Sequence, residues 1–285
     1  QGAPRGAAGS PRAYAQPVRG PWTTYARRAE EWFSDPVRVP GYVAAHSGSS
    51  PESFIFNRRI ELVLSELAGH PGGTLIDIGC GPGMLLAALG ASRPGDFEAL
   101  GVDISPPMVE EASRRLSSAS GARVLVGRAE ELPLPDEVAD IALAMGILEL
   151  ADPHRVLAEA ARVLRPGGLA VVSMVNPSAP ARIWAQRVYE PLRRRRGWGW
   201  VDGWDPAEIP MSEPDLVRTL HLHGLRPVRV RHFVFDPVWP PLDRRLPGLR
   251  GSAMRRLEPL GRGPLRRLGS YYLIVARREG RDTPV

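Results

Sequence analysis

The feature that most restricts the fold of this chain is a glycine-rich turn that directly follows a short apolar segment. The segment Thr74-Leu-Ile-Asp77 ends on a carboxylate, and Gly79-Cys-Gly-Pro-Gly83 then leads into an apolar run with the length of a helix. Glycines let the backbone turn sharply and approach a ligand closely, and a helix N-terminus offers unpaired amide groups. A strand, a tight turn and a helix in this order predict a nucleotide-binding site in an α/β domain.

A second carboxylate narrows the kind of nucleotide. Asp103 lies 20 residues after Gly83 at the end of the next apolar run, where it can accept the hydroxyl protons of a ribose. A dinucleotide fingerprint needs a third glycine where Met84 stands. Asp77 would also repel a pyrophosphate, whereas it suits a cationic amino-acid ligand. The sequence therefore disfavours a nicotinamide or flavin dehydrogenase.

The alternation of strand and helix patterns after residue 71 predicts a mostly parallel sheet. Short apolar runs alternate with helical patterns, and the last of these helices is followed by two further strands, the final one antiparallel. We expect helices after Pro51, over Met108–Leu116, over Pro153–Leu164 and from Ser212 to Gly224. The predicted strands are Thr74–Asp77, Ala99–Asp103, Arg123–Val126, Ile141–Met145, Leu169–Ser173, Pro227–Phe235 and Ser270–Ala276, with a Pro/Arg-rich loop between the last two.

Composition divides the chain into regions. Residues 1–21 are rich in Gly, Ala, Pro and Arg and are interpreted as a flexible tail. Residues 22–70 carry aromatic residues and helical periodicity and are predicted to form an N-terminal helical lid. Residues 71–285 form the main domain, with a cap insertion over 177–211. The expected architecture is one doubly wound α/β domain with a helical cap over its ligand.

The cysteine count and the net charge give only weak constraints on the cellular compartment and the partners of the protein. Cys80 is the single cysteine, which excludes an intramolecular disulfide and favours a reducing cytoplasm, and no apolar run has the length of a membrane span. The net charge is +6, but all 37 basic residues are Arg, which indicates a compositional bias of the coding sequence. The positive charge is therefore weak evidence for nucleic acid as a partner.

Five segments in order resemble class I S-adenosylmethionine-dependent methyltransferases, of the broad subgroup that includes quinone-biosynthesis and natural-product enzymes. The resemblance covers residues 74–176, about a third of the chain, and implies a Rossmann-like fold with a seven-stranded sheet. The matching segments are Leu75-Ile-Asp-Ile-Gly-Cys-Gly-Pro-Gly83, Gly101-Val-Asp-Ile-Ser-Pro-Pro-Met108, Gly127-Arg-Ala-Glu-Glu-Leu-Pro-Leu-Pro135, Ile147-Leu-Glu-Leu-Ala-Asp-Pro153 and Ala161-Arg-Val-Leu-Arg-Pro-Gly-Gly168.

The resemblance also implies which residues hold S-adenosylmethionine and its product S-adenosylhomocysteine. The glycine-rich turn would surround the methionine part, Asp103 the ribose, and the Met145 carbonyl the amino group. Arg128 departs from the family, which often has Asp there, so the polar contact to adenine falls to Glu130 or to backbone. The implied cofactor-binding residues are Asp77, Gly79, Cys80, Gly81, Gly83, Asp103, Ile104, Met108, Ala129, Glu130 and Met145.

The sequence marks catalytic residues poorly, because the sulfonium already activates the methyl group and the protein mainly aligns the reactants. His46 in the lid, Glu149 after the fourth strand and Asn176 after the fifth are candidates. Each also has a structural reading, as a loop residue, a helix-start residue and a turn residue. His221, His223 and His232 show no metal-ligand spacing, so we expect no metal. Trp22 and Tyr25 are candidates for covering the cofactor.

We expect a small-molecule acceptor, in specialised metabolism, methylated on O, N or C. The stretch Arg193–Trp200 with Trp204 fits a substrate lid or a solvated loop, and it leaves peripheral membrane contact with a lipid or quinone-like acceptor open. An RNA or protein methyltransferase is a further alternative, although no appended recognition module is visible. A protein that binds the cofactor without transferring its methyl group is another. The sequence leaves the oligomeric state open.

Overall fold

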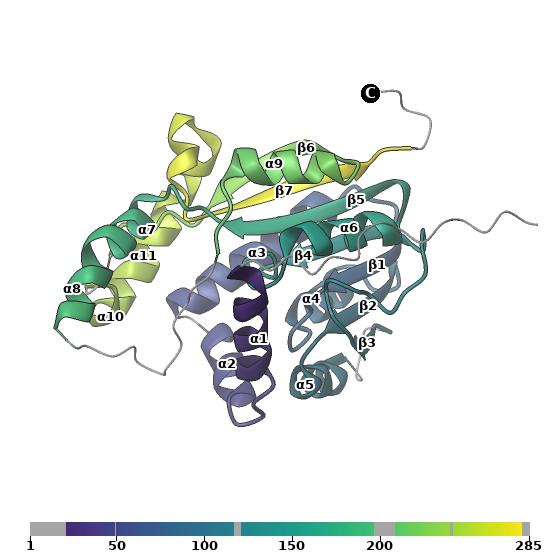
Figure 1. Ribbon diagram of the computed structural model, residues 1–285, viewed down its shortest axis with the longest axis horizontal. Helices are drawn as coiled ribbons and strands as arrows, with labels where there is room; N and C mark the ends of the chain where they lie inside the picture. The colour runs from purple at the N-terminus through teal and green to yellow at the C-terminus, as the bar shows by residue number, and fades with distance from the viewer. Residues whose placement is uncertain (1–20, 49, 117–120, 197–208, 240–241, 281–285) are drawn as a thin grey trace, which may run out of the picture.

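The protein is built on one seven-stranded sheet (Figure 1), described by a computed structural model over residues 21–48, 50–116, 121–196, 209–239 and 242–280. The strand order is β3-β2-β1-β4-β5-β7-β6. All seven predicted strands are confirmed, with ends displaced by a few residues. The strands are β1 (Gly73–Ile78), β2 (Phe97–Asp103), β3 (Arg123–Val126), β4 (Ala139–Met145), β5 (Leu164–Val175), β6 (Leu225–Phe233) and β7 (Tyr271–Arg278).

The pairing of the strands confirms the predicted mostly parallel sheet. The pairs among β1 to β5 are all parallel, whereas β7 lies between β5 and β6 and runs antiparallel to both. The chain moves outward from β1 through β2 to β3 and then returns to β4 on the other side of β1. The carboxyl ends of β1 and β4 therefore flank the point where the winding direction reverses, which is where α/β sheets bind ligands.

Helices cover both faces of the sheet (Figure 1). On one face α6 and α9 pack against the strands through residues such as Leu157 and Leu220. On the other face α3, α4 and α5 pack through residues such as Val63 and Leu86, together with Met254 of α11. The longer helices are α1 (Pro21–Phe33), α2 (Val39–His46), α3 (Pro51–Leu67), α4 (Met84–Ser92), α5 (Pro106–Leu116), α6 (Pro153–Val163), α9 (Glu213–Leu222) and α11 (Pro247–Leu257).

The helix starts follow capping signals that are visible in the sequence. The Ser50 side chain accepts a hydrogen bond from the Ser53 amide before α3, and Asp152 accepts from the amides of His154 and Arg155 before α6. Ser212 caps α9 in the same way. In each of these helices a proline stands at the first or second helical position. Its missing N–H costs nothing there, because the first amides of a helix have no partner within the helix.

The connection between β6 and β7 corrects the prediction of a loop. It contains α10 (Leu242–Arg245), α11 and the short helices η3 (Glu258–Arg262) and η4 (Pro264–Leu268). Pro247 stands in the first turn of α11, where proline is tolerated, and Met254 is buried in the core. The high content of Pro and Arg concealed a helix whose apolar contact is made by very few residues.

The segments expected to form a cap behave differently from one another. In Figure 1, α1 and α2 lie beside the end of the sheet near α5, while α3 belongs to the core under the sheet. The insertion contributes α7 (Pro180–Trp184), the π-helical turn η1 (Ala185–Tyr189) and α8 (Glu190–Arg195); residues 197–208, including Trp198, Trp200 and Trp204, lie outside the described residues. Within the described part, no helix is both long and apolar enough to cross a bilayer.

Two glycines bring the turn after β1 against its neighbours. A Cβ at Gly101 of β2 would lie 2.7 Å from the sulfur of Cys80, and one at Gly83 would lie 3.0 Å from the Cβ of Ala112 in α5. Backbone at these points approaches closer than any side chain would allow. The turn is thereby held at the carboxyl end of β1, where the candidate site forms.

Candidate functional site

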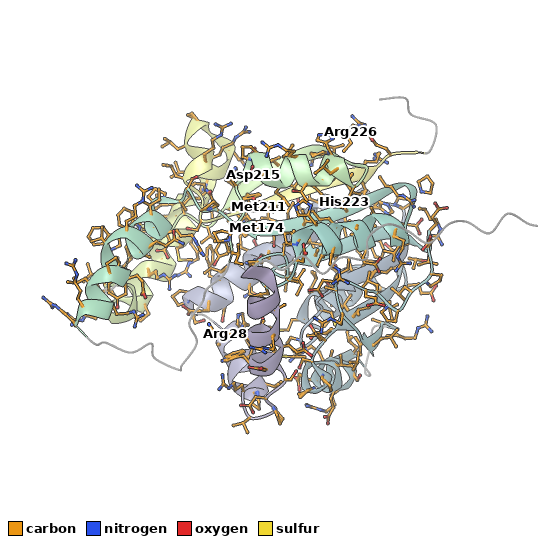
Figure 2. The ribbon with its side chains drawn as sticks, in the orientation of Figure 1. Arg28, Met174, Met211, Asp215, His223 and Arg226 are labelled. Carbon is orange, nitrogen blue, oxygen red and sulfur yellow. The ribbon has the colours of Figure 1, made fainter. Side chains whose placement is uncertain are left out.

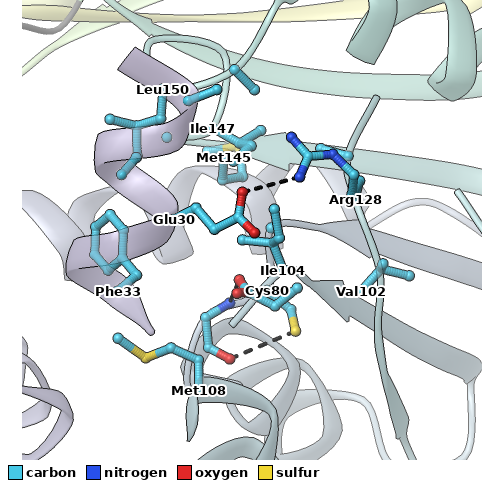
Figure 3. A pocket seen from close by; sticks show the side chains of 18 of the residues that line it. Glu30, Phe33, Cys80, Val102, Ile104, Met108, Arg128, Met145, Ile147 and Leu150 are labelled. Carbon is cyan, nitrogen blue, oxygen red and sulfur yellow. Dashed lines mark hydrogen bonds and ion pairs between the residues drawn. The ribbon is translucent and has the colours of Figure 1, made fainter. Parts of the chain in front are cut away.

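A cavity of about 940 Å³, including its open mouth, lies at the carboxyl ends of β1, β2 and β4. Its floor is the turn after β1, and its cover comes from α1, α2 and α3. Figure 3 shows Phe33 and Glu30 of α1 facing Cys80, Ile104 and Met108 across it.

The floor is a run of glycines in left-handed conformations. Gly79, Gly81 and Gly83 have φ of 76°, 51° and 73°. The amides of Gly79 and Cys80 both donate to the carbonyl of Val102, at 2.7 and 3.1 Å, which fixes the turn on β2. A Cβ at Gly81 would meet no atom within 4 Å, because this glycine faces the cavity. The turn leaves backbone exposed to whatever the cavity holds.

Asp103 ties the turn to the end of β2. Its Oδ2 accepts from the Gly81 amide at 2.8 Å and its Oδ1 from the Ser105 amide at 3.0 Å. Burial raises the pKa of this carboxyl, and the hydrogen bonds from Ser105, Gly81 and Ile104 oppose that rise. Each carboxylate oxygen retains a lone pair. Asp103 lines the cavity and can therefore accept two hydroxyl groups there.

Asp77 lies one layer below the cavity, at the end of β1. It is buried with 2% of its surface exposed and is not among the residues that line the cavity wall. Burial raises its pKa to about 7, and repulsion from Asp103 adds to the rise. A cation placed above the turn would lower that pKa again, since an opposite charge favours the ionised form. Two buried carboxyls therefore make the floor of the cavity attractive to a positive charge.

Cys80 lines the cavity but has no sign of nucleophilic activation. Its thiol points to the Gly81 carbonyl at 3.6 Å, and burial together with the two aspartates raises its pKa well above the usual value. Nucleophilic cysteines need the opposite shift. The geometry therefore favours a structural role for Cys80, as a small residue that fits a tight turn.

The other end of the cavity is apolar with a charged rim. Ile104, Met108, Ala129 and Glu130 all line it, as the family resemblance implies for an adenine site. Arg128 forms an ion pair with Glu30 of α1 at 3.0 Å (Figure 3), so the residue that departs from the family pattern links the cover to the domain. Both side chains are more than a third exposed, so the pair contributes little stability by itself.

The structure brings most of the predicted cofactor residues together. Gly79, Cys80, Gly81, Asp103, Ile104, Met108, Ala129, Glu130 and Met145 line one cavity. Gly83 lies just behind it as the N-cap of α4, and Asp77 lies below it. The assignment of these residues to a cofactor stays a prediction that their common position supports.

Arg59 of α3 is a charged residue of the cavity that was not predicted from the sequence. It lines the cavity, its Nη2 lies 3.6 Å from Oε1 of the buried Glu149, and its guanidinium stacks over the Tyr271 ring at 4.8 Å. Its Nε is buried without a hydrogen-bond partner. A signal existed: Arg59 stands on the apolar face of α3, four residues after Ile55 and four before Val63. An Arg on a core-facing stripe needs a partner.

His46 lies behind the cover and not in the cavity wall. Its ring stacks on Tyr42 at 4.1 Å and meets Phe56 edge-on at 5.3 Å, and both of those residues line the cavity. Its Nδ1 is 2.8 Å from the Tyr42 carbonyl, which can only accept, so Nδ1 carries the proton and Nε2 is the basic nitrogen. Burial lowers the pKa of His46 and favours this neutral form. Its catalytic role stays a prediction.

Glu149 and Asn176, the other two catalytic candidates, do not reach the cavity wall. Glu149 is buried behind Arg59. Asn176 has its side-chain amide fully engaged: its nitrogen donates to the carbonyls of Arg267 and Gly269 at 3.0 and 2.8 Å, and its oxygen accepts from the Ser178 amide. This arrangement gives Asn176 a structural role at the end of β5.

The remaining histidines lie apart from the cavity wall or contact other side chains. His232 contacts Glu213 at 2.8 Å, and the His154 and His223 rings lie 5.8 Å apart. Among the described residues, no group of three or more His, Cys, Asp or Glu side chains is arranged to hold an ion. For Trp22 and Tyr25, only the helical backbone of α1 is described, so their proposed covering role stays a prediction.

Residues 76–172 match the family model of a methyltransferase domain. Among curated proteins, a malonyl-[acyl-carrier protein] O-methyltransferase of Methylococcus capsulatus is 26% identical over 211 residues, 72% of each chain. A demethylmenaquinone methyltransferase of Bacillus licheniformis is 36% identical over 101 residues, and an uncharacterized transposon protein of Streptomyces fradiae is 40% identical over 112. These last two matches span only 44% and 32% of the relatives' lengths, and 35% and 39% of this chain.

Solved structures share the fold over nearly the whole chain. A magnesium protoporphyrin IX methyltransferase from Synechocystis with bound S-adenosylhomocysteine has a TM-score of 0.60 at 14% identity, covering 89% of this chain and 99% of that one. A methyltransferase from Thermotoga maritima has a TM-score of 0.58 at 23% identity, covering 90% and 99%. Residues 76–172 are therefore similar to a methyltransferase domain, and the chain shares the fold of these two solved methyltransferases.

The raised pKa of Asp77 makes a prediction about stability. In the ligand-free protein this carboxyl binds its proton up to about pH 7, whereas in the unfolded chain it loses it near pH 4. The native state therefore holds more protons between these limits, and its contribution to the free energy of unfolding falls as pH rises through that window. The variant Asp77→Asn removes the effect. Between pH 5 and pH 8 the free energy of unfolding of the variant should therefore rise by about 1–3 kcal/mol relative to that of wild type.

Urea unfolding of the ligand-free protein at several pH values measures this difference. Glu98→Gln, an exposed carboxylate at the start of β2, is the matched control and should leave the pH dependence unchanged. Parallel pH curves for wild type and Asp77→Asn would show that Asp77 is not the buried acid described above.

Proposed function

We propose that this protein transfers the methyl group of S-adenosylmethionine to a small, largely apolar acceptor. The observation that supports it most is the charge arrangement of one cavity. Asp77 is buried beneath its glycine floor, Asp103 lines its wall, the partly exposed guanidinium of Arg59 lies in its cover, and apolar surface lies between them. The buried Cys80 thiol and the absence of other cysteines fit a reducing, cytoplasmic setting.

The donor end of the cavity fits the cofactor by its own chemistry. Asp103 offers two carboxylate lone pairs to ribose hydroxyls, and Ile104, Met108 and Ala129 offer apolar surface to adenine. Glu130 and neighbouring backbone remain for the polar edge of the base. The glycine turn, with Asp77 beneath it, favours a cationic group, and the Met145 carbonyl at the end of β4 is available to accept from an ammonium. When bound, S-adenosylmethionine supplies a methyl group activated by a sulfonium.

Arg59 is proposed to bind the carboxylate of the cofactor's amino-acid part. Removing part of a cation from water costs free energy unless it is paired. The 3.6 Å separation from Glu149, together with a buried Nε that has no hydrogen-bond partner, leaves the partly exposed Arg59 incompletely satisfied. Arg59 packs directly over Gly146, where a Cβ would lie 2.7 Å from Nη1. This places its guanidinium beside the end of β4, next to Met145, which is where the amino-acid part is expected.

The acceptor end is aromatic and aliphatic. Phe33, Tyr42 and Phe56 from the cover face Ile147 and Leu150 from the loop after β4. Burial raises the pKa of Tyr42 to about 12, so its phenol is neutral and can donate a hydrogen bond to an acceptor oxygen or nitrogen. The demethylmenaquinone specificity in one relative's name fits such a lining. We assign the acceptor to a lipophilic small molecule on this basis.

The protein's contribution to the chemistry is alignment and exclusion of water. Among the titratable residues named above, Cys80 is protonated, Tyr42 is neutral, and the basic Nε2 of His46 lies behind the cavity wall. An acceptor that ionises readily, or a carbon made nucleophilic by its own substituents, needs no strong base. The cover formed by α1, α2 and α3 would hold that acceptor in line with the methyl group, which is where most of the rate enhancement arises.

Transfer of a labelled methyl group tests this function. The protein and methyl-labelled S-adenosylmethionine are incubated in three separate reactions. One contains a lipophilic metabolite extract, one total RNA and one a denatured protein extract. Label should appear in the organic-soluble fraction together with S-adenosylhomocysteine, and Asp103→Ala should abolish it while Glu98→Ala retains it. Label in RNA or protein would reject the small-molecule assignment, and cofactor binding without S-adenosylhomocysteine formation would reject methyl transfer altogether.

The role of Arg59 has a test independent of the acceptor. Arg59→Gln should weaken S-adenosylhomocysteine binding about 10–100-fold, because a charge-assisted hydrogen bond is worth about 1.5–3 kcal/mol. Methylthioadenosine lacks the amino-acid part, so its affinity should be unchanged. Calorimetry with both ligands, and with Arg59→Lys as the conservative variant, separates the role from misfolding. Equal losses for both ligands would contradict it.

A further inference from the structure

The positive charge of the chain is concentrated in two segments that are distant in sequence. Residues 180–196 and 242–268 contain fourteen of the 37 basic residues and three of the 31 acidic ones, a net charge of +11, while the rest of the chain is net −5. The overall charge of +6 is thus a local property. A compositional bias toward Arg alone would spread it over the whole surface.

The same two segments concentrate exposed apolar side chains. Of the fourteen large apolar residues exposed in the described part, nine lie within these 44 residues. The first segment contributes one stripe at helical spacing, Trp184, Val188 and Leu192, with Ile183 beside it. The second contributes Leu242, Leu246 and Leu249 along α10 and α11, and Leu265 and Leu268 on η4.

The fold places the two segments in one lobe. Figure 1 shows α7, α8, α10 and α11 grouped at one end of the molecule. The ring of Trp184 in α7 lies 6.0 Å from that of Trp239, which precedes α10. Arg58 to Glu258 and Arg250 to Glu52 join the second segment to α3. None of the lobe's residues lines the cavity, so the lobe is a surface separate from the candidate active site.

Many arginines of the lobe are available to an external anion. Within the described part, Arg187, Arg195, Arg245 and Arg256 are exposed and form no ion pair, and the same holds for Arg262, Arg266 and Arg267. Arg193 and Arg250, in contrast, pair with Glu190 and Asp236 and belong to the internal structure. The exposed face therefore alternates unpaired guanidinium groups with aliphatic side chains.

We infer that this lobe docks on the surface of an anionic lipid bilayer. Arg side chains reach phosphates at the level of the headgroups, while Leu, Val, Ile and Trp beside them leave water for the acyl boundary. RNA would pair with the arginines but would leave the aliphatic residues in water, because its bases stack on aromatic rings. A second copy of the chain would bring like charges together. The bilayer satisfies both kinds of side chain at once.

Binding to vesicles tests the docking surface. The intact protein is sedimented with vesicles of phosphatidylcholine plus phosphatidylglycerol and with vesicles of phosphatidylcholine alone. It should bind the anionic vesicles and lose affinity with added salt. The charge variant R187Q/R195Q/R245Q/R256Q should bind at least about tenfold more weakly, since each basic residue near an anionic surface contributes to binding. The apolar variant V188S/L192S/L246S/L249S should lose affinity as well.

Matched variants elsewhere on the surface control for net charge. R114Q/R218Q/R226Q/R277Q removes four exposed arginines outside the lobe, and Arg226 lies at the opposite end of the molecule in Figure 2. This variant should bind vesicles like wild type, and all variants should bind S-adenosylhomocysteine with unchanged affinity. Equal losses in the lobe and control charge variants, no wild-type binding to anionic vesicles, or tight binding to RNA that the serine substitutions leave intact would each overturn the inference.

Discussion

Two buried carboxyls at the ends of adjacent strands determine the rest of the site. Asp77 and Asp103 end β1 and β2 on either side of the glycine turn, and the Gly81 amide is bonded directly to Asp103. Burial, and to a smaller extent repulsion from Asp103, raises the pKa of Asp77 to about 7. A cation above the turn would relieve that repulsion. The folded site therefore favours binding of a positively charged ligand.

The opposite wall of the cavity carries the complementary charge. Arg59 brings a guanidinium to the cover, and Glu149 behind it compensates only part of that charge. A ligand with an ammonium and a carboxylate at one end, and a neutral nucleoside at the other, matches both walls. The same helix that carries Arg59 also anchors the Arg-rich lobe through Arg58 and Glu52. Helix α3 therefore contacts both the lobe and the cavity.

Local signals in the sequence were sufficient for the sheet, the capped helices and the glycine turn. Gly79 to Gly83 and Asp103 depend on backbone geometry that their own sequence dictates, so the motif predicted that they lie together at one end of the sheet, whereas their role toward a cofactor stays a prediction. Arg59, Phe56 and Tyr42 belong to the cover, where tertiary packing decides which side chains reach the ligand. Helix α11 was missed because its core contact rests on Met254 and Gly251 amid prolines and arginines.

The charge arrangement is tested most directly by counting the protons exchanged when S-adenosylhomocysteine binds. Calorimetric titrations at pH 6 in two buffers of different ionisation enthalpy give this number. Binding should release protons from Asp77 at pH 6, and fewer protons at pH 8, where Asp77 is already largely ionised. Binding with no proton release at pH 6, or no binding, would show that Asp77 is not a protonated acid beneath the ligand.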